Sequence, residues 1–133
     1  MKVKSFKIYP SRASKWYYTV HIFAQKRTMY RYRKLLQTED NANPIKSFKF
    51  LALVSAFNSK HKEYQYGEIL FTKNSSSRSG IVSHELCHAL TYWWKDMESY
   101  KWEEITNNGR ADERHALLLG KMVQQYWYNW WKK

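Results

Sequence analysis

Two histidines and a glutamate of this chain have the spacing of a zinc-binding catalytic motif. His84 and His88 are four residues apart, and Glu85 directly follows the first of them. On a helix, residues at i and i+4 lie on one face, so the two imidazoles can hold one metal ion together. Glu85 then lies beside the metal-bound water, whose pKa the metal lowers, and can accept its proton. We therefore predict a catalytic Zn²⁺ held by His84 and His88, with Glu85 as the general base.

A catalytic zinc needs a third protein ligand, and the sequence offers three candidates for it. The residues directly after His88 include no further histidine, and the candidates Asp112, Glu113 and His115 follow about 25 residues later. We favour Glu113, because Asp112 has a shorter side chain and His115 lies about 200° away from Glu113 on an ideal helix. The predicted metal ligands are therefore His84, His88 and Glu113, with Asp112 or His115 as the alternative third ligand.

Other polar residues are expected to have lesser roles. Cys87 is interpreted as a small buried hydrophobe, with a ligand or redox role as the alternative, because its side chain points away from the face of the two histidines. Tyr92 and His115 are candidates for stabilising the oxyanion of a tetrahedral intermediate. His21 and His61 are interpreted as ordinary strand or surface residues.

The elements that must position these residues are strands in the first two-thirds of the chain. Aromatic and β-branched content, or an alternation with a period of two residues, predicts each strand. The expected strands are Lys2–Tyr9, Trp16–Phe23, Thr28–Leu36 and Tyr64–Thr72. Phe48–Phe57 is the most apolar run, and its leucine and alanine residues favour a short helix over a buried strand.

Two long helices are expected in the last third of the chain. Lys73–Gly80 is a serine-rich loop that leads into a helix over Ile81–Lys95, which carries the motif. Asp96–Gly109 is a connector, and Ala111–Trp130 is the second helix. Strands followed by helices indicate an α+β fold. We expect residues 1–133 to form a single domain, in which a small, mostly antiparallel N-terminal sheet packs on two C-terminal helices that carry the metal site.

The sequence from residue 64 to residue 125 resembles the zincin metallopeptidases of the glutamate-zincin branch. Gly67–Phe71 followed by Val82–Leu90 is similar to their unit of a strand and an active helix, and Asp112–Ala116, with its Glu-x-x-Ala core, is similar to their third-ligand helix. Small metallopeptidases encoded by phages and mobile elements look most alike. The resemblance implies a zinc peptidase in which the strand before the active helix, here Gly67–Thr72, pairs with an extended peptide substrate.

The composition adds a possible partner surface to this expectation. Hydrophobic residues make up 44% of the chain, which excludes a disordered composition, and the formal net charge is +12. Residues 1–50 carry twelve Lys and Arg and two acidic residues, a balance of +10, whereas residues 51–133 carry eleven and nine. The basic N-terminal half therefore suits nucleic acid or an acidic protein partner, with a solvated face as the alternative.

Cysteine content and hydropathy indicate the cellular compartment that we expect for this protein. Cys87 is the only cysteine, so an intramolecular disulfide is not possible. The basic N-terminus has no apolar segment of the secretory type behind it, and no apolar run approaches the length of about 18 residues that a membrane span needs. We therefore expect a cytoplasmic protein that does not enter the membrane.

Two functions remain open at this point. The first is a zinc-dependent metallopeptidase that acts on a protein or peptide substrate. The second is a non-catalytic binding or inhibitor protein that keeps a zincin-like scaffold and uses its basic N-terminal half on its partner. Glu85 favours the first, because a site that used zinc only for structure would not need this carboxylate and would have four Cys and His ligands.

Overall fold

A computed structural model describes residues 2–11, 14–40, 52–56, 64–97 and 109–132 of the chain. The described strands form one four-stranded sheet in the order β1-β2-β4-β3. The strands are β1 (Lys2–Ile8), β2 (Tyr17–Phe23), β3 (Ala52–Ala56) and β4 (Gln65–Thr72). The helices are α1 (Lys26–Asp40), the 3₁₀ turn η1 (Ser75–Ser77), α2 (Ser79–Met97) and α4 (Gly109–Trp131).

The predicted α+β class and the mostly antiparallel sheet are confirmed. β1 runs antiparallel to β2, and β3 runs antiparallel to β4, whereas the central pair β2 and β4 is parallel. The predicted helices over Ile81–Lys95 and Ala111–Trp130 correspond to α2 and α4, each longer by about two residues at its ends. The rest of the predicted connector, residues 98–108, lies outside the described residues.

The predicted strand over Thr28–Leu36 is wrong, because this segment belongs to helix α1. The alternation of tyrosine and arginine there has a period of two, but the buried side chains have the spacing of a helix. Met29, Tyr30 and Arg33 are buried, whereas Arg31 and Lys34 are exposed. Burial at i, i+1 and i+4 matches one face of a helix and cannot be met by a strand, whose buried positions alternate.

The short helix favoured over Phe48–Phe57 is also wrong for the part that the structure describes. Ala52–Ala56 forms β3 and pairs antiparallel with β4, while residues 48–51 and 57 lie outside the described residues. The helix preference of alanine and leucine is worth only a fraction of a kilocalorie per residue, so pairing with a neighbouring strand overrides it.

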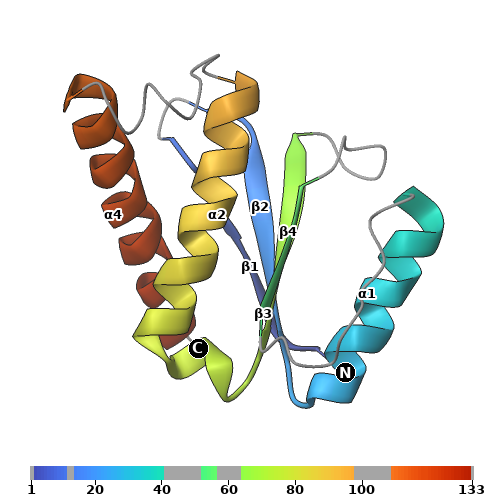
Figure 1. Cartoon of the computed structure of the whole chain (residues 1–133). Helices are drawn as coiled ribbons and strands as arrows, with labels where there is room; N and C mark the ends of the chain where they lie inside the picture. The colour runs from blue at the N-terminus through green and yellow to red at the C-terminus, as the bar shows by residue number, and fades with distance from the viewer. Residues whose placement is uncertain (1, 12–13, 41–51, 57–63, 98–108, 133) are drawn as a thin grey trace.

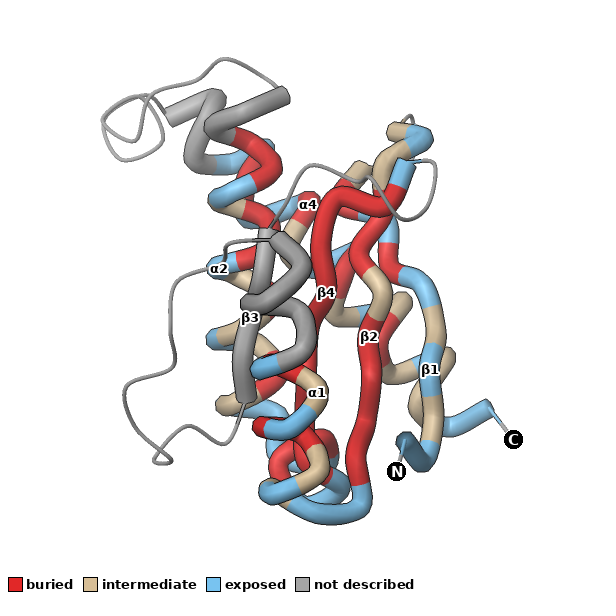
Figure 2. The backbone as a smooth tube through the Cα atoms, turned by 90° about the vertical axis from the view of Figure 1, so that its right-hand side faces the viewer, coloured by how far each residue is buried: buried red, intermediate tan, exposed pale blue. Residues whose placement is uncertain are grey.

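The main core lies between one face of the sheet and helices α2 and α4 (Figure 1). Successive side chains of a strand point to opposite faces, so β2 and β4 each supply alternate residues to this core. Its sheet side includes Tyr18, Val20, Ile22, Ile69 and Phe71, and its helix side includes Val82, Leu86, Leu90, Trp94, Met122 and Tyr126. The tube in Figure 2 shows the same pattern, with β2 and β4 almost wholly buried and β1 largely exposed.

The opposite face of the sheet is covered in part by α1. A smaller cluster forms there from Phe23 and Leu70 of the sheet and Met29 and Tyr30 of the helix. The fold therefore has three layers, with the sheet between α1 on one side and α2 with α4 on the other (Figure 1).

Candidate metal centre

The rotation of α2 on the sheet places the motif histidines on its outer side. Val82, Leu86, Ala89 and Trp93 form the buried stripe of the helix, at the spacing of one helical face. His84 and His88 fall on the opposite side and are both exposed.

Two tyrosines of the sheet hold this rotation in place. The Tyr18 hydroxyl donates a hydrogen bond of 2.7 Å to the carbonyl of Ala89, and the Tyr66 hydroxyl donates one of 3.1 Å to the carbonyl of Tyr92. Because both bonds reach the backbone of α2 from the sheet, they oppose turning of the helix about its axis.

The connection between β4 and α2 also anchors α4. The Ser75 hydroxyl bonds to Thr72 and closes the turn at the end of β4. The Tyr126 hydroxyl donates to the carbonyl of Ser76 at 2.8 Å, and the Trp130 indole donates to the Ser76 hydroxyl at 3.2 Å. Helix α4 is therefore bound to the start of the motif helix through its C-terminal half.

The two motif histidines converge on one point. The Nε2 atoms of His84 and His88 lie 3.1 Å apart, and their rings meet at an angle of 82°. Two nitrogens bound to the same tetrahedral zinc at 2.0–2.1 Å would lie about 3.3 Å apart. This geometry fits two ligands of one zinc ion. The exposed ring of Tyr92 stacks beside His88, with the ring centroids 6.0 Å apart.

The ionisation of the motif residues agrees with that fit. Burial and the neighbouring His84 lower the pKa of His88, so its ring is neutral at pH 7, as a metal ligand requires. Burial raises the pKa of the Glu85 carboxyl, and the neighbouring His84 opposes this rise only in part. A carboxylate with a raised pKa is a stronger base, which suits proton transfer from water.

The structure does not bring Glu113 to the two histidines. Glu113 is exposed near the start of α4, whereas His115, two residues later, is buried against α2. The Nε2 atom of His115 lies 3.3 Å from the Thr91 hydroxyl, and its ring packs on Trp94. Because the two positions lie about 200° apart on an ideal helix, only one of them can face α2.

The third ligand therefore remains a prediction. Within the described ranges, no three or more His, Cys, Asp or Glu residues are grouped so that they could hold a metal ion. The side chain of Asp112 lies outside the described residues. His84 and His88 are the two predicted ligands that the structure brings together, and Cys87 between them is half-buried.

The expected pairing of Gly67–Thr72 with a substrate strand is not possible in this sheet. These residues lie in β4, and β2 and β3 occupy both of its edges. The outer strands among the described residues are β1 and β3, and β3 is the one that contacts α2.

His21 lies in strand β2, as expected, but it is not a surface residue. His21 is buried and bonds to the buried Glu68 on the far face of the sheet from α2. Neither residue has a local sequence signal, because the pair exists only through the register of β2 on β4. His61 lies outside the described residues.

No described helix is long and apolar enough to cross a membrane. Comparison of the chain with protein-family models, curated sequences and solved structures found no match.

Proposed function

We propose that the protein is a zinc-dependent hydrolase of the metallopeptidase type. The observation that carries the proposal is the convergence of the two Nε2 atoms, 3.1 Å apart, on the same helix as Glu85. Two imidazoles at this separation have the donor type and spacing that zinc prefers. When bound, Zn²⁺ supplies Lewis acidity, which polarises a carbonyl and makes water acidic enough to lose a proton near neutral pH.

Four residues of α2 have distinct roles in the proposed reaction. His84 and His88 would hold the metal, and Glu85, which is half-buried and has a raised pKa, would accept the proton of the attacking water. The same carboxyl can then return that proton to the leaving amine. Tyr92 lies next to His88 and is exposed, so its hydroxyl is available to a developing oxyanion.

A peptide is the proposed substrate class because the sheet offers an outer strand beside the motif helix. β3 is an outer strand of the described sheet: one of its edges pairs with β4, and no described strand pairs with the other. β3 also contacts α2. An extended peptide that added to β3 would receive backbone hydrogen bonds from it. The substrate would then run along the helix that carries Glu85.

The zinc site is tested by metal content. We expect the purified protein to hold close to one equivalent of zinc per chain, and the double variant His84→Ala/His88→Ala to hold almost none. Both side chains are exposed, so the apo variant should keep the thermal stability of the wild-type apo protein. Elemental analysis and thermal melts measure the two quantities.

A matched control separates loss of ligands from general surface effects. Lys121 and Gln124 are exposed on α4, and their double alanine variant should keep its zinc. Wild-type zinc content in the double histidine variant would refute the site.

Nucleic-acid binding is a second candidate, and the charge of α1 favours it. Arg27, Arg31 and Lys34 are exposed at i, i+4 and i+7, so they form one outward basic stripe. Residues 1–38 contain no acidic residue. A cationic stripe on the outer face of a helix suits the phosphate backbone of nucleic acid.

This second function predicts a steep dependence on salt. We expect single-stranded nucleic acid to bind at low ionic strength, with an affinity that falls by about tenfold or more between 50 and 200 mM salt. Changing Arg27, Arg31 and Lys34 together to glutamine should reduce the slope of log affinity against log salt by about two to three. Fluorescence anisotropy measures both, and the Lys121→Gln variant is the control. If no binding is found at low salt, the stripe serves only solubility.

A further inference from the structure

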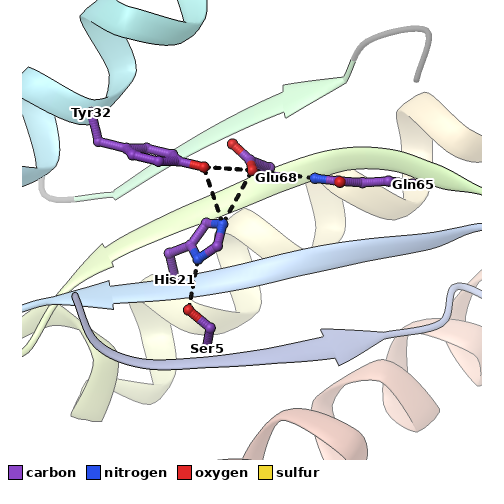
Figure 3. A network of polar contacts seen from close by, with 5 residues as sticks. All are labelled: Ser5, His21, Tyr32, Gln65 and Glu68. Carbon is purple, nitrogen blue, oxygen red and sulfur yellow. Dashed lines mark hydrogen bonds and ion pairs between the residues drawn. The ribbon is translucent and has the colours of Figure 1, made fainter. Parts of the chain in front are cut away.

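A network of polar side chains lies on the face of the sheet opposite the proposed metal centre (Figure 3). It joins Ser5 of β1, His21 of β2, Glu68 and Gln65 of β4, and Tyr32 of α1. The neighbours of His21 on β2, Val20 and Ile22, point into the core below α2 and α4. His21 therefore faces the other way, and the network shares no residue with the metal motif.

The central members form a chain of three groups. Ser5 Oγ lies 2.8 Å from Nδ1 of His21, and Nε2 of the same ring lies 3.1 Å from Oε1 of Glu68. Ser5 and His21 are directly opposite each other in the register of β1 on β2. A hydroxyl, an imidazole and a carboxylate connected in this order are the parts of a nucleophile, its base and the group that orients the base.

Three side chains form hydrogen bonds with the Glu68 carboxyl. Burial raises the pKa of Glu68, but hydrogen bonds from His21, Tyr32 and Gln65 outweigh it and bring the pKa below its ordinary value. The Tyr32 hydroxyl and the Gln65 amide donate to Oε1 at 2.7 and 3.2 Å. The lowered pKa favours the anionic form of Glu68. In the tautomer of His21 whose Nε2 carries the proton toward Glu68, Nδ1 has a lone pair that accepts the proton of the Ser5 hydroxyl.

Of the three connected side chains, Ser5 is open to solvent, whereas His21 and Glu68 are not. Ser5 is exposed, whereas the side chains of His21 and Glu68 are each 7% exposed. Two cations lie on the same face: Lys7 sits 4.5 Å from the Tyr17 ring, and Lys2 sits 5.3 Å from the Tyr32 ring. A substrate that reaches Ser5 therefore meets positive charge beside it, which favours an anionic oxygen.

We propose that Ser5 is the nucleophile of a second, metal-independent reaction, with activated carboxylic esters of anionic character as its substrate class. Ser5 Oγ forms a bond to the acyl carbon, and its proton moves to Nδ1 of His21. The bond between the acyl carbon and the leaving oxygen breaks, and the alcohol departs with that proton. Water then attacks the acyl-serine by the same route, which releases the acid and restores the hydroxyl.

A purely structural network would have a different property. Tyr32 connects α1 to β4 through Glu68, and this connection alone would stabilise the fold. It would not make the Ser5 hydroxyl more reactive than any other exposed serine. Reactivity of Ser5 toward an electrophile therefore separates the two roles.

The test is covalent labelling of the full chain with a fluorophosphonate probe, in the presence of a zinc chelator. Ser5 Oγ bonds to phosphorus, fluoride leaves, and the serine proton leaves with it through His21. We expect one adduct at Ser5, formed at least about 10²-fold faster than at the exposed serines Ser77 and Ser79 of the same molecule. Intact mass and peptide mapping locate and quantify it.

Three variants complete the experiment. Ser5→Ala should carry no adduct, and Glu68→Gln, checked for folding by circular dichroism, should label at least about tenfold more slowly than wild type. His84→Ala/His88→Ala should label at the wild-type rate, because its changes lie on the other face of the sheet. Labelling of Ser5 at the rate of Ser77 overturns the proposal, and so does a folded Glu68→Gln variant that labels as fast as wild type.

Discussion

Replacing Glu85 by glutamine should leave zinc bound and lower the turnover of a peptide substrate by at least about 10²-fold. Glutamine keeps the size of the side chain and its half-buried position on α2 but cannot accept a proton from water. The proposed ligands His84 and His88 are unchanged in this variant, and their Nε2 atoms should remain 3.1 Å apart, so zinc content should stay near one equivalent. Elemental analysis and a cleavage assay, on a substrate found by a peptide screen of the wild-type protein, measure the two effects.

The control for this variant lies at a neighbouring position of α2. Ser83→Ala changes a half-buried residue next to His84 and should keep both zinc and turnover. If Glu85→Gln cleaves at the wild-type rate, the proposed mechanism is wrong even where zinc is present. If it loses zinc as well, Glu85 acts on the metal ligands and not on water alone.

If Glu113 is the third ligand in the zinc-bound protein, changing it to alanine should weaken zinc binding by more than about 100-fold. Loss of an outer-shell partner costs only roughly 10–100-fold. Only two protein ligands would remain, fewer than a catalytic zinc site requires. Glu113 is exposed, so the change should alter the stability of the apo protein by no more than about 0.5 kcal/mol. Competition with a chromophoric chelator measures the affinity, and chemical denaturation measures the stability.

The position of His115 provides the alternative outcome. His115 faces α2 and lies beside Thr91, which follows His88 by three residues. If Glu113→Ala binds zinc as tightly as wild type, the third ligand lies elsewhere, and Asp112→Ala and His115→Ala are measured in the same assay. Because His115 is buried, its variant also needs the stability measurement, which separates loss of a ligand from loss of packing.

The sequence alone predicted the parts of this protein that depend on local spacing. The motif helix and the second long helix are where their apolar periodicity places them, and the strands β1, β2 and β4 lie within their predicted segments. The meeting of His84 and His88 follows from the same cause, because two residues at i and i+4 share a helical face in any fold. The selection of Glu85 as the candidate base needed no tertiary information either, since it is adjacent to a predicted ligand in the sequence.

Only the tertiary structure decided which faces and which strands meet. Thr28–Leu36 became a helix, and Ala52–Ala56 became a strand, because burial against the sheet and pairing with β4 outweigh weak local preferences. The outward position of Glu113 depends on the rotation of α4, which packing and the bonds to Ser76 determine. The alignment of Ser5, His21 and Glu68 depends on strand register, where a shift by one residue would turn each side chain to the other face. The rotation of a helix and the register of strands arise from contacts between residues far apart in the chain. Local sequence patterns therefore do not predict them.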